Sequence, residues 1–320
     1  MELLIEKIMS TVLITGASGF IGANLVRNLI NTKDQIHILI RKQSNLWRLN
    51  NIISECNVHF VDISKIEEVK NIISEIKPEI VYHCATYGVY PNQKDVSKMD
   101  QTNVVGTLNL LKALHENSEL KRLVNLGSVF EYGSKSNSTK ETDPAQPFDS
   151  YSATKVSQTK LVEEYSRQKK LPAVTLRIFT PYGIFEEPGR LISDLMVATV
   201  KKKPLKIRSR KSKRDFVYID DVTSALIKAA NKPGIEGEIF NIGSGSATSV
   251  EDLVNLVCKV TDTNLEVSWP DENQRENDKM NANGFADIQK AKKIDWKPEV
   301  SLKDGLSRTY EWFLQNIKLY

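Results

Sequence analysis

The amino-acid sequence predicts an α/β fold with a doubly wound parallel sheet, and two observations support this prediction. Short apolar runs alternate with helical patterns through the first 180 residues, which is typical of right-handed βαβ units. A glycine-rich turn directly follows the first apolar run. Together these features predict a Rossmann-type sheet, whose ligands bind at the carboxyl ends of the strands.

Six apolar runs are predicted to be buried strands, because each is short and rich in Val, Ile and Leu. They are, in chain order, STVLITG, QIHILI, NVHFVD, EIVYHCA, KRLVNLGS and AVTLRIF. The segments between them carry apolar residues at helical spacing. We therefore predict helices in FIGANLVRNLIN, SKIEEVKNIISEI, MDQTNVVGTLNLLKALHEN and YSATKVSQTKLVEEYSRQ.

The pattern is less regular after residue 180. RDFVYIDDVTSALIKAAN is predicted to be strand, turn and helix, GEIFNIGSG a further strand and SVEDLVNLVCKV a further helix. We expect a dinucleotide-binding domain of residues 1–180 plus about 214–245. A smaller, discontinuous substrate domain is expected from about 181–213 and 246–320.

Composition narrows the class of protein. The chain has 320 residues, 40% of them hydrophobic, and a net charge of +4, which is ordinary for a globular protein. Its three cysteines form no CxxC pair, and its four histidines do not pair with acids at metal-ligand spacing, so we expect neither disulfides nor a metal. No run of apolar residues has membrane-spanning length and no secretory signal opens the chain, so a cytoplasmic protein is expected.

Two basic runs, KKKP at 201–204 and RSRKSKR at 208–214, carry much of the positive charge. Nucleic-acid binding is one interpretation of such runs. A solvated face or a site for a small anion is the other, and we favour it because no aromatic residues are interleaved as stacking platforms. No nucleic-acid partner is therefore expected.

The turn TGASGFIG places Gly16, Gly19 and Gly22 between the first strand and the first helix. Glycines there allow a tight turn and a close approach of the backbone to a pyrophosphate, which meets the N-terminus of the helix. The spacing is GxxGxxG, and a glycine triplet alone is a weak pattern. Its position between strand and helix makes it a prediction of dinucleotide binding.

The end of the second strand indicates which dinucleotide binds. An acid about 20 residues after the glycines would accept a hydrogen bond from the ribose 2′-hydroxyl. Arg41 and Lys42 stand there instead, while Asp34 precedes the strand. A guanidinium cannot accept a hydrogen bond but pairs well with a 2′-phosphate, and Ser44 could add a hydroxyl donor. We therefore predict NADPH/NADP as the cofactor; the alternative is a solvent-exposed Arg-Lys pair.

Three tyrosines are followed four residues later by a lysine, so the spacing alone means little. Tyr90 precedes a proline, which disfavours a helix, and Tyr165 lies at the far end of its predicted helix. Tyr151, with Lys155, opens its helix near the carboxyl edge of the sheet, close to Ser128 at the end of the LGS strand. We predict that these three residues are catalytic.

The chemistry fits the residue types. Tyrosine has a reference pKa of about 10 and is a weak acid–base catalyst near neutral pH. A nearby ammonium and a positively charged nicotinamide are expected to lower that pKa toward the working range. Ser128 would orient the same substrate oxygen.

Further motifs accompany these residues: VD at 61–62, HCAT at 83–86, Asn103 and RDFVYIDDV. Together they resemble the extended short-chain dehydrogenase/reductase family, in particular its branch that acts on nucleotide-activated sugars. The resemblance covers nearly the whole chain. It implies a nucleotide-sugar substrate, and a dimer formed through the helices at about 98–117 and 151–168. The resemblance also implies which residues bind the cofactor. Besides the three glycines, Arg41, Lys42, Ser44, Tyr151 and Lys155, they are Ser18, Phe20, Ile21, Asp62, Ile63, Cys84, Ala85, Thr86 and Thr180.

Candidate residues for the substrate follow from the resemblance and from positions at strand ends. Arg190, Arg214 and Arg275 are candidates for the sugar nucleotide and its phosphates. Ser128, Tyr87, Asn92 and Glu131 are candidates for the sugar. At the end of its strand, His83 is expected to be structural rather than catalytic.

Departures from the commoner patterns of this family narrow the reaction. Dehydratases carry an Asp-Glu pair after the catalytic hydroxyl, where this chain has Val129 and Phe130, so dehydration is not expected. Many epimerases have Asn where Thr180 stands, and hold NAD through an acid. ATYG, IRKQSN and the segment 275–298 are similar to NADPH-dependent CDP-4-keto-dideoxyhexose reductases. We predict a 4-keto-reductase; the alternatives are a nucleotide-sugar 4-epimerase and a non-catalytic NADP-sensing protein, which would not need the Ser-Tyr-Lys set.

Overall fold

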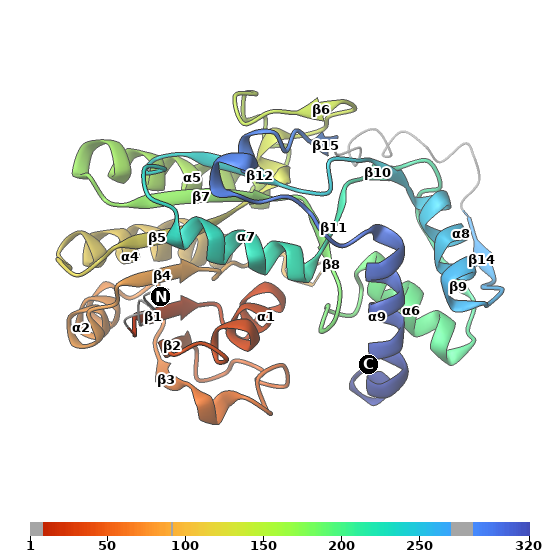
Figure 1. Cartoon of the computed structure of the whole chain (residues 1–320), viewed down its shortest axis with the longest axis horizontal. Helices are drawn as coiled ribbons and strands as arrows, with labels where there is room; N and C mark the ends of the chain where they lie inside the picture. The colour runs from red at the N-terminus through yellow and green to blue at the C-terminus, as the bar shows by residue number, and fades with distance from the viewer. Residues whose placement is uncertain (1–8, 91, 270–283) are drawn as a thin grey trace, which may run out of the picture.

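A seven-stranded parallel sheet forms the centre of the molecule (Figure 1). The computed structural model describes residues 9–90, 92–269 and 284–320. The strand order is β12-β7-β5-β4-β1-β2-β3, so the chain winds outward from β1 in both directions and the predicted Rossmann-type fold is confirmed. The strands are β1 Thr11–Thr15, β2 Gln35–Ile40, β3 Asn57–Phe60, β4 Ile80–His83, β5 Arg122–Ser128, β7 Ala173–Ile178 and β12 Ile239–Ile242.

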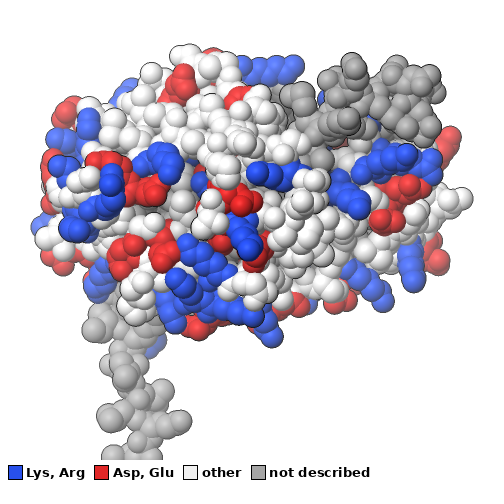
Figure 2. Space-filling model, turned by 90° about the horizontal axis from the view of Figure 1, so that it is seen from above, with Lys and Arg blue, Asp and Glu red and all other residues white. Residues whose placement is uncertain are grey.

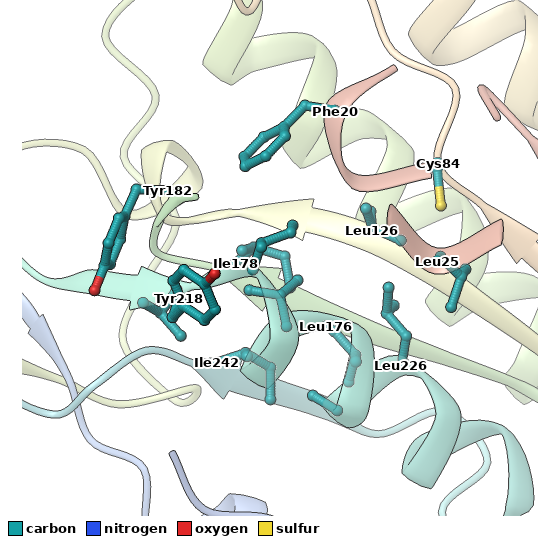
Figure 3. Packing of buried hydrophobic residues seen from close by; sticks show 14 of the residues in the cluster. Phe20, Leu25, Cys84, Leu126, Leu176, Ile178, Tyr182, Tyr218, Leu226 and Ile242 are labelled. Atoms are coloured by element: carbon teal, nitrogen blue, oxygen red, sulfur yellow. The ribbon is translucent and has the colours of Figure 1, made fainter. Parts of the chain in front are cut away.

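Helices cover both faces of this sheet. One face packs against α1 (Phe20–Leu29) and α7 (Ile219–Asn231), through a core that includes Leu25, Leu176 and Leu226 (Figure 3). The other face packs against α2 (Ile66–Ile76), α4 (Gly106–His115) and α5 (Ser150–Lys169). With both faces covered, the strands are buried on both sides, which explains why they are apolar runs in the sequence.

The helix expected at about 98–117 is interrupted. It consists of α3 (Val96–Met99), a π-helical turn over Asp100–Val105, and α4. The π turn brings the buried Asn103 amide to the Tyr87 carbonyl oxygen and the Thr154 hydroxyl, at 2.8 and 2.9 Å. Helical spacing in a sequence does not distinguish such a turn from an ordinary one, and π turns are frequent near functional sites.

The remaining elements extend from the carboxyl end of the sheet (Figure 1). The helices are α6 (Leu191–Lys201), α8 (Val250–Thr261) and α9 (Leu302–Asn316). Short strands pair as β8 (Thr180–Tyr182) with β11 (Phe216–Tyr218), β9 (Leu205–Lys206) with β14 (Val267–Ser268), β10 (Lys213–Arg214) with β13 (Thr248–Ser249), and β6 (Ser138–Thr139) with β15 (Phe285–Ala286). Short 3-10 turns cover Ile53–Glu55, Val129–Tyr132, Lys290–Ile294 and Ile317–Leu319. The division into two domains at the expected boundaries remains a prediction.

Charges of both signs are interspersed on the face shown in Figure 2, where Lys and Arg side chains lie among Asp and Glu side chains. Within the part of the chain that the structure describes, no helix combines the length and apolar character needed to cross a membrane.

Candidate functional site

A pocket of about 590 Å³ opens at the carboxyl ends of the parallel strands. Its walls come from the glycine turn, the residues after β2, β4 and β5, the start of α5, and the segment after β7. This is the edge where an open α/β sheet binds its ligands. The pocket is large enough for a ligand of several hundred Å³.

The glycine turn forms a close-packed backbone cradle. Gly16 has φ +66°, and a Cβ there would lie 2.5 Å from the backbone N of Ala85. A Cβ on Gly22 would lie 2.3 Å from the Gly16 carbonyl oxygen. Gly19 is the N-cap of α1 and supplies no side-chain cap to the first N–H groups of the helix. The turn therefore suits an anion such as a pyrophosphate.

Arg41 and Ser44 line the pocket directly after β2. The Arg41 N–H donates to the Ser44 hydroxyl at 3.0 Å, and the Ser44 N–H donates to the Arg41 carbonyl oxygen at 2.9 Å, which holds both residues in one turn. Lys42 lies between them but is exposed and does not line the pocket. Asp34 accepts from the Ser10 N–H at the opposite end of β2, far from this corner in the strand.

The other residues expected at the cofactor all line the same pocket. They are Ser18, Phe20, Ile21, Asp62, Ile63, Cys84, Ala85, Thr86 and Thr180. A carboxylate oxygen of Asp62 already accepts from the Ser64 N–H and hydroxyl, at 3.0 and 2.8 Å. The structure thus brings together the glycine turn, Arg41 and these side chains around one pocket.

Ser128, Tyr151 and Lys155 also line the pocket. Ser128 is the last residue of β5. The helix α5 begins after Asp149, whose carboxylate caps the helix by accepting a hydrogen bond from the Ser152 N–H at 2.7 Å. Tyr151 lies in the first turn of α5, with Lys155 one turn later on the same face. The ring of Phe130 meets that of Tyr151 edge-on, with centroids 6.1 Å apart.

The pKa of Tyr151 differs from our expectation. Burial raises it to about 12, and this effect outweighs the opposing contributions of the Ser128 hydrogen bond, Arg190 and the Thr86 hydrogen bond. The protein groups alone therefore raise this pKa, and the lowering by Lys155 together with a positively charged nicotinamide stays a prediction. The physical reason is that the phenol loses water on entering the pocket wall, which disfavours the phenolate.

The ammonium of Lys155 is buried and points into the protein. It donates to the Leu126 carbonyl oxygen at 2.5 Å and to the side-chain oxygen of Gln158. Burial lowers the pKa of Lys155 to about 8. Gln158 in turn donates to Asn125 at 2.9 Å, so the lysine is held by a hydrogen-bonded chain that reaches β5.

Two candidate substrate residues do not reach the pocket. Glu131 is wholly buried: its carboxylate accepts from the Ser128 N–H and from Nε of Arg177, both at 2.8 Å. Its assignment to the sugar is therefore wrong, because the 3-10 turn after β5 directs it back into the core. Tyr87 does not line the pocket either, and its N–H donates to Asn103.

Asn92, Arg190 and Arg214 do line the pocket. Arg190 is the N-cap residue of α6, and its Nε lies 3.4 Å from Oε1 of Glu186. Burial, and then the charge of Arg190, lower the pKa of Arg214. Arg275 lies outside the described residues.

Several lining residues were not found from the sequence: Arg48, Tyr90, Glu186, Glu187 and Phe130. Arg48 pairs with Glu187 across the pocket wall. Tyr90 is not in a helix, but a loop residue can line a pocket equally well. Most of these residues stand in irregular segments, where neither hydrophobic periodicity nor spacing indicates the direction of a side chain.

The model of the family described as "NAD dependent epimerase/dehydratase family" matches residues 12–243. The chain is 29% identical over 318 residues to a trifunctional UDP-glucose 4,6-dehydratase/UDP-4-keto-6-deoxy-D-glucose 3,5-epimerase/UDP-4-keto-L-rhamnose-reductase of Arabidopsis thaliana. That match covers 95% of this chain and 47% of the relative, so the chain spans about half the length of that protein.

Two solved structures are similar over nearly their whole length. One is the UDP-glucose 4-epimerase of Thermotoga maritima with UDP-glucose, with a TM-score of 0.85 and 26% identity, covering 96% of this chain and 99% of the other. The second is the UDP-glucuronic acid 4-epimerase of Bacillus cereus in complex with NAD, with a TM-score of 0.83 and 27% identity, covering 96% and 99%.

Proposed function

Because the chain belongs to the NAD dependent epimerase/dehydratase family, we propose that it is an NADPH-dependent reductase of a nucleotide-activated 4-keto-6-deoxy sugar. The observation that carries this proposal is the corner formed by Arg41 and Ser44 after β2, which presents a cation and a hydroxyl to the pocket. A guanidinium suits a 2′-phosphate and cannot accept from a 2′-hydroxyl. The structurally similar epimerase from Bacillus cereus is described in complex with NAD, so that similarity does not support NADPH. The proposed preference of this chain for NADPH therefore rests on Arg41.

In the proposed reaction the bound cofactor supplies a hydride to C4 of the sugar. Tyr151 gives its phenolic proton to the C4 oxygen, so that the carbonyl becomes a secondary alcohol. Ser128 donates a hydrogen bond to the same oxygen and orients it. The positive charge of Lys155 stabilises the phenolate that remains, and a proton from solvent restores Tyr151.

The second candidate function is nucleotide-sugar 4-epimerisation, and the names of both structural neighbours favour it. An epimerase must retain its NAD, because the hydride returns to the sugar within one turnover. A reductase instead exchanges its cofactor in every turnover. Cofactor retention therefore distinguishes the two functions. A non-catalytic NADP sensor would have no use for the set Ser128, Tyr151 and Lys155.

The first experiment measures which cofactor the purified protein binds and whether it already carries one. We expect NADPH to bind about 10- to 100-fold more tightly than NADH, since a charge-assisted contact contributes roughly 1.5–3 kcal/mol. Arg41→Ala should remove this preference. Lys42→Ala is the matched control and should keep it, because the neighbouring lysine lies outside the pocket.

Turnover is then assayed with 4-keto sugar nucleotides carrying UDP, dTDP, CDP or GDP, following the oxidation of NADPH. Exchangeable NADPH with turnover of one of these ketones would support the reductase. Tightly retained NAD without preference for NADPH would contradict it and make epimerisation the leading function.

A further inference from the structure

Glu186 is a buried carboxyl group at the wall of the pocket that the proposed reaction does not use. Its relative exposure is 3%. Oε1 lies 3.4 Å from Nε of Arg190, and the backbone N–H of Ser193 acts on the carboxyl to lower its pKa, whereas Oε2 is buried and makes no hydrogen bond of ordinary geometry with the described residues. Glu186 also borders a second cavity of about 10 Å³, which lies against Arg190 and Arg214. Buried carboxylate oxygens normally have partners, so this group calls for an explanation.

Charged and titratable groups face Glu186 from every element around it. Arg190 at the start of α6 is its ion-pair partner, and Asp194, one turn later, is a second carboxylate whose own pKa is raised by burial. The other groups in electrostatic contact with Glu186 are Arg214 of β10, Tyr90 after β4, Tyr182 of β8 and Tyr320 at the end of the chain. Within these, only the two arginines are cations.

The same two arginines are the candidate ligands for the diphosphate of a nucleotide sugar. A diphosphate that pairs with Arg190 and Arg214 removes the counter-ion of Glu186 and places new negative charge beside it. An ionised carboxylate with an orphaned oxygen is strongly disfavoured in such surroundings. The carboxyl must then either leave the site or become neutral.

We propose that Glu186 is a further substrate-binding residue, which releases Arg190 to the diphosphate and takes up one proton from solvent as the nucleotide sugar binds. This inference rests on the proposed function, because it assumes a nucleotide-sugar substrate. The protonated carboxyl then has an O–H that can donate to a phosphate oxygen. Burial already raises the pKa of Glu186 to about 7, so protonation near neutral pH is readily available.

The test is calorimetric titration of the full chain with UDP-glucose, dTDP-glucose, CDP-glucose and GDP-glucose at pH 8, in two buffers with different ionisation enthalpies. The diphosphate of these probes does not titrate in this range. We expect uptake of close to one proton with the probe that binds best. The affinity should fall between pH 7.5 and 9, by up to about tenfold per pH unit.

Glu186→Gln should reduce the uptake by close to one proton and flatten the pH dependence relative to the wild type. The comparison is made as this difference, because Lys155, with a pKa of about 8, titrates equally in both proteins. Asp194→Asn is the matched control and should retain the wild-type uptake and pH dependence, since it removes the nearest rival carboxyl. Uptake that persists undiminished in Glu186→Gln, or a wild type that binds without uptake, would overturn the proposal and leave the proposed function intact. Failure of all four probes to bind to protein that still binds NADPH would overturn this proposal together with the proposed substrate class.

Discussion

Tyr151 holds its proton strongly in this structure, since burial raises the pKa of the phenol to about 12. The neutral phenol is the form that donates a proton, as reduction of a ketone requires. Oxidation of a hydroxyl, the first step of an epimerase, needs the phenolate instead. In its protonated form Tyr151 can therefore supply the proton that the proposed reduction needs.

We predict that Tyr151→Phe lowers kcat for ketone reduction by about 10²–10⁴-fold, the usual contribution of a positioned general acid. NADPH affinity should change far less than kcat, which a fluorescence titration would check. Tyr165→Phe, on the same helix but outside the pocket, is the control and should keep full activity. A Tyr151→Phe enzyme with the wild-type kcat would rule out the proposed acid.

His83 has a structural role, as expected. Its Nδ1 lies 2.7 Å from the Thr15 hydroxyl and its Nε2 lies 2.8 Å from the Thr107 hydroxyl, so it links β1 to α4 beneath the pocket. Burial, and then the charge of Lys155, lower its pKa to about 3. The folded protein therefore disfavours the imidazolium, whereas the unfolded chain protonates His83 near pH 6.5.

The sign of the pH dependence follows from linkage. Between about pH 3 and 6.5 the unfolded state binds one more proton at His83, so the free energy of unfolding falls by up to about 1.4 kcal/mol for each pH unit of acidification. His37 and His59 also have lowered pKa values and add in the same direction. We predict that His83→Gln is less stable than the wild type at pH 7 by roughly 1–3 kcal/mol, and that this difference shrinks by pH 5. Urea unfolding at pH 7 and at pH 5 measures the difference in free energy of unfolding between the two proteins. A difference that is the same at both pH values would contradict a buried, neutral His83.

At the scale of elements, the turn after β5 decides where its side chains point. Ser128 caps the 3-10 turn Val129–Tyr132, and the carboxylate of Glu131 returns to the Ser128 N–H. The sequence indicates a strand that ends in a serine, but not that Glu131 faces the core. That depends on Arg177 of β7, a partner 46 residues away in the chain.

Glu131→Ala would leave the buried guanidinium of Arg177 without its carboxylate. We predict a loss of about 3–5 kcal/mol in the free energy of unfolding, the usual effect of breaking a buried pair. Glu141→Ala, which removes a half-buried acid elsewhere, should cost less. Chemical denaturation compares the two variants. Equal, small losses would show that the pair of Glu131 and Arg177 is not an important contact.

The predictable elements are those whose pattern is local. The parallel strands are continuous apolar runs, the glycine turn follows β1, and α5 has Asp149 as its cap. The π turn at Asp100–Val105 and the segment 183–190 could not be predicted, because both depend on contacts with distant side chains. Phe185 is an example: its φ of +65° is unusual for a residue with a side chain, and Arg27 lies over its ring at 3.8 Å.

At the scale of the whole molecule, one cluster of side chains connects three distant segments of the chain. Arg48, seven residues after Arg41, donates to the Phe185 carbonyl oxygen at 2.8 Å and pairs with Glu187. The hydroxyl of Tyr320 donates to the Glu186 carbonyl oxygen at 2.7 Å. The segment after β2 and the segment after β8 are thus connected to each other and to Tyr320 at the end of the chain. A ligand that orders one of these segments lowers the cost of ordering the other.

We predict that NADPH and the nucleotide sugar bind with positive coupling, and that Tyr320→Phe and Arg48→Lys reduce it. Coupling between two sites typically amounts to about 5- to 150-fold in affinity. The measurement is the affinity for the best-binding nucleotide-glucose with and without saturating NADPH, in the wild type and in both variants. Tyr320 does not line the pocket, so a change in its variant acts through the segment that it holds.

By linkage, the sugar nucleotide must change the NADPH affinity by the same factor. Lys42→Ala, which touches neither the cluster nor the pocket, should retain the wild-type coupling. If the ratio of affinities is the same in all four proteins, the cluster stabilises the fold but does not connect the two sites.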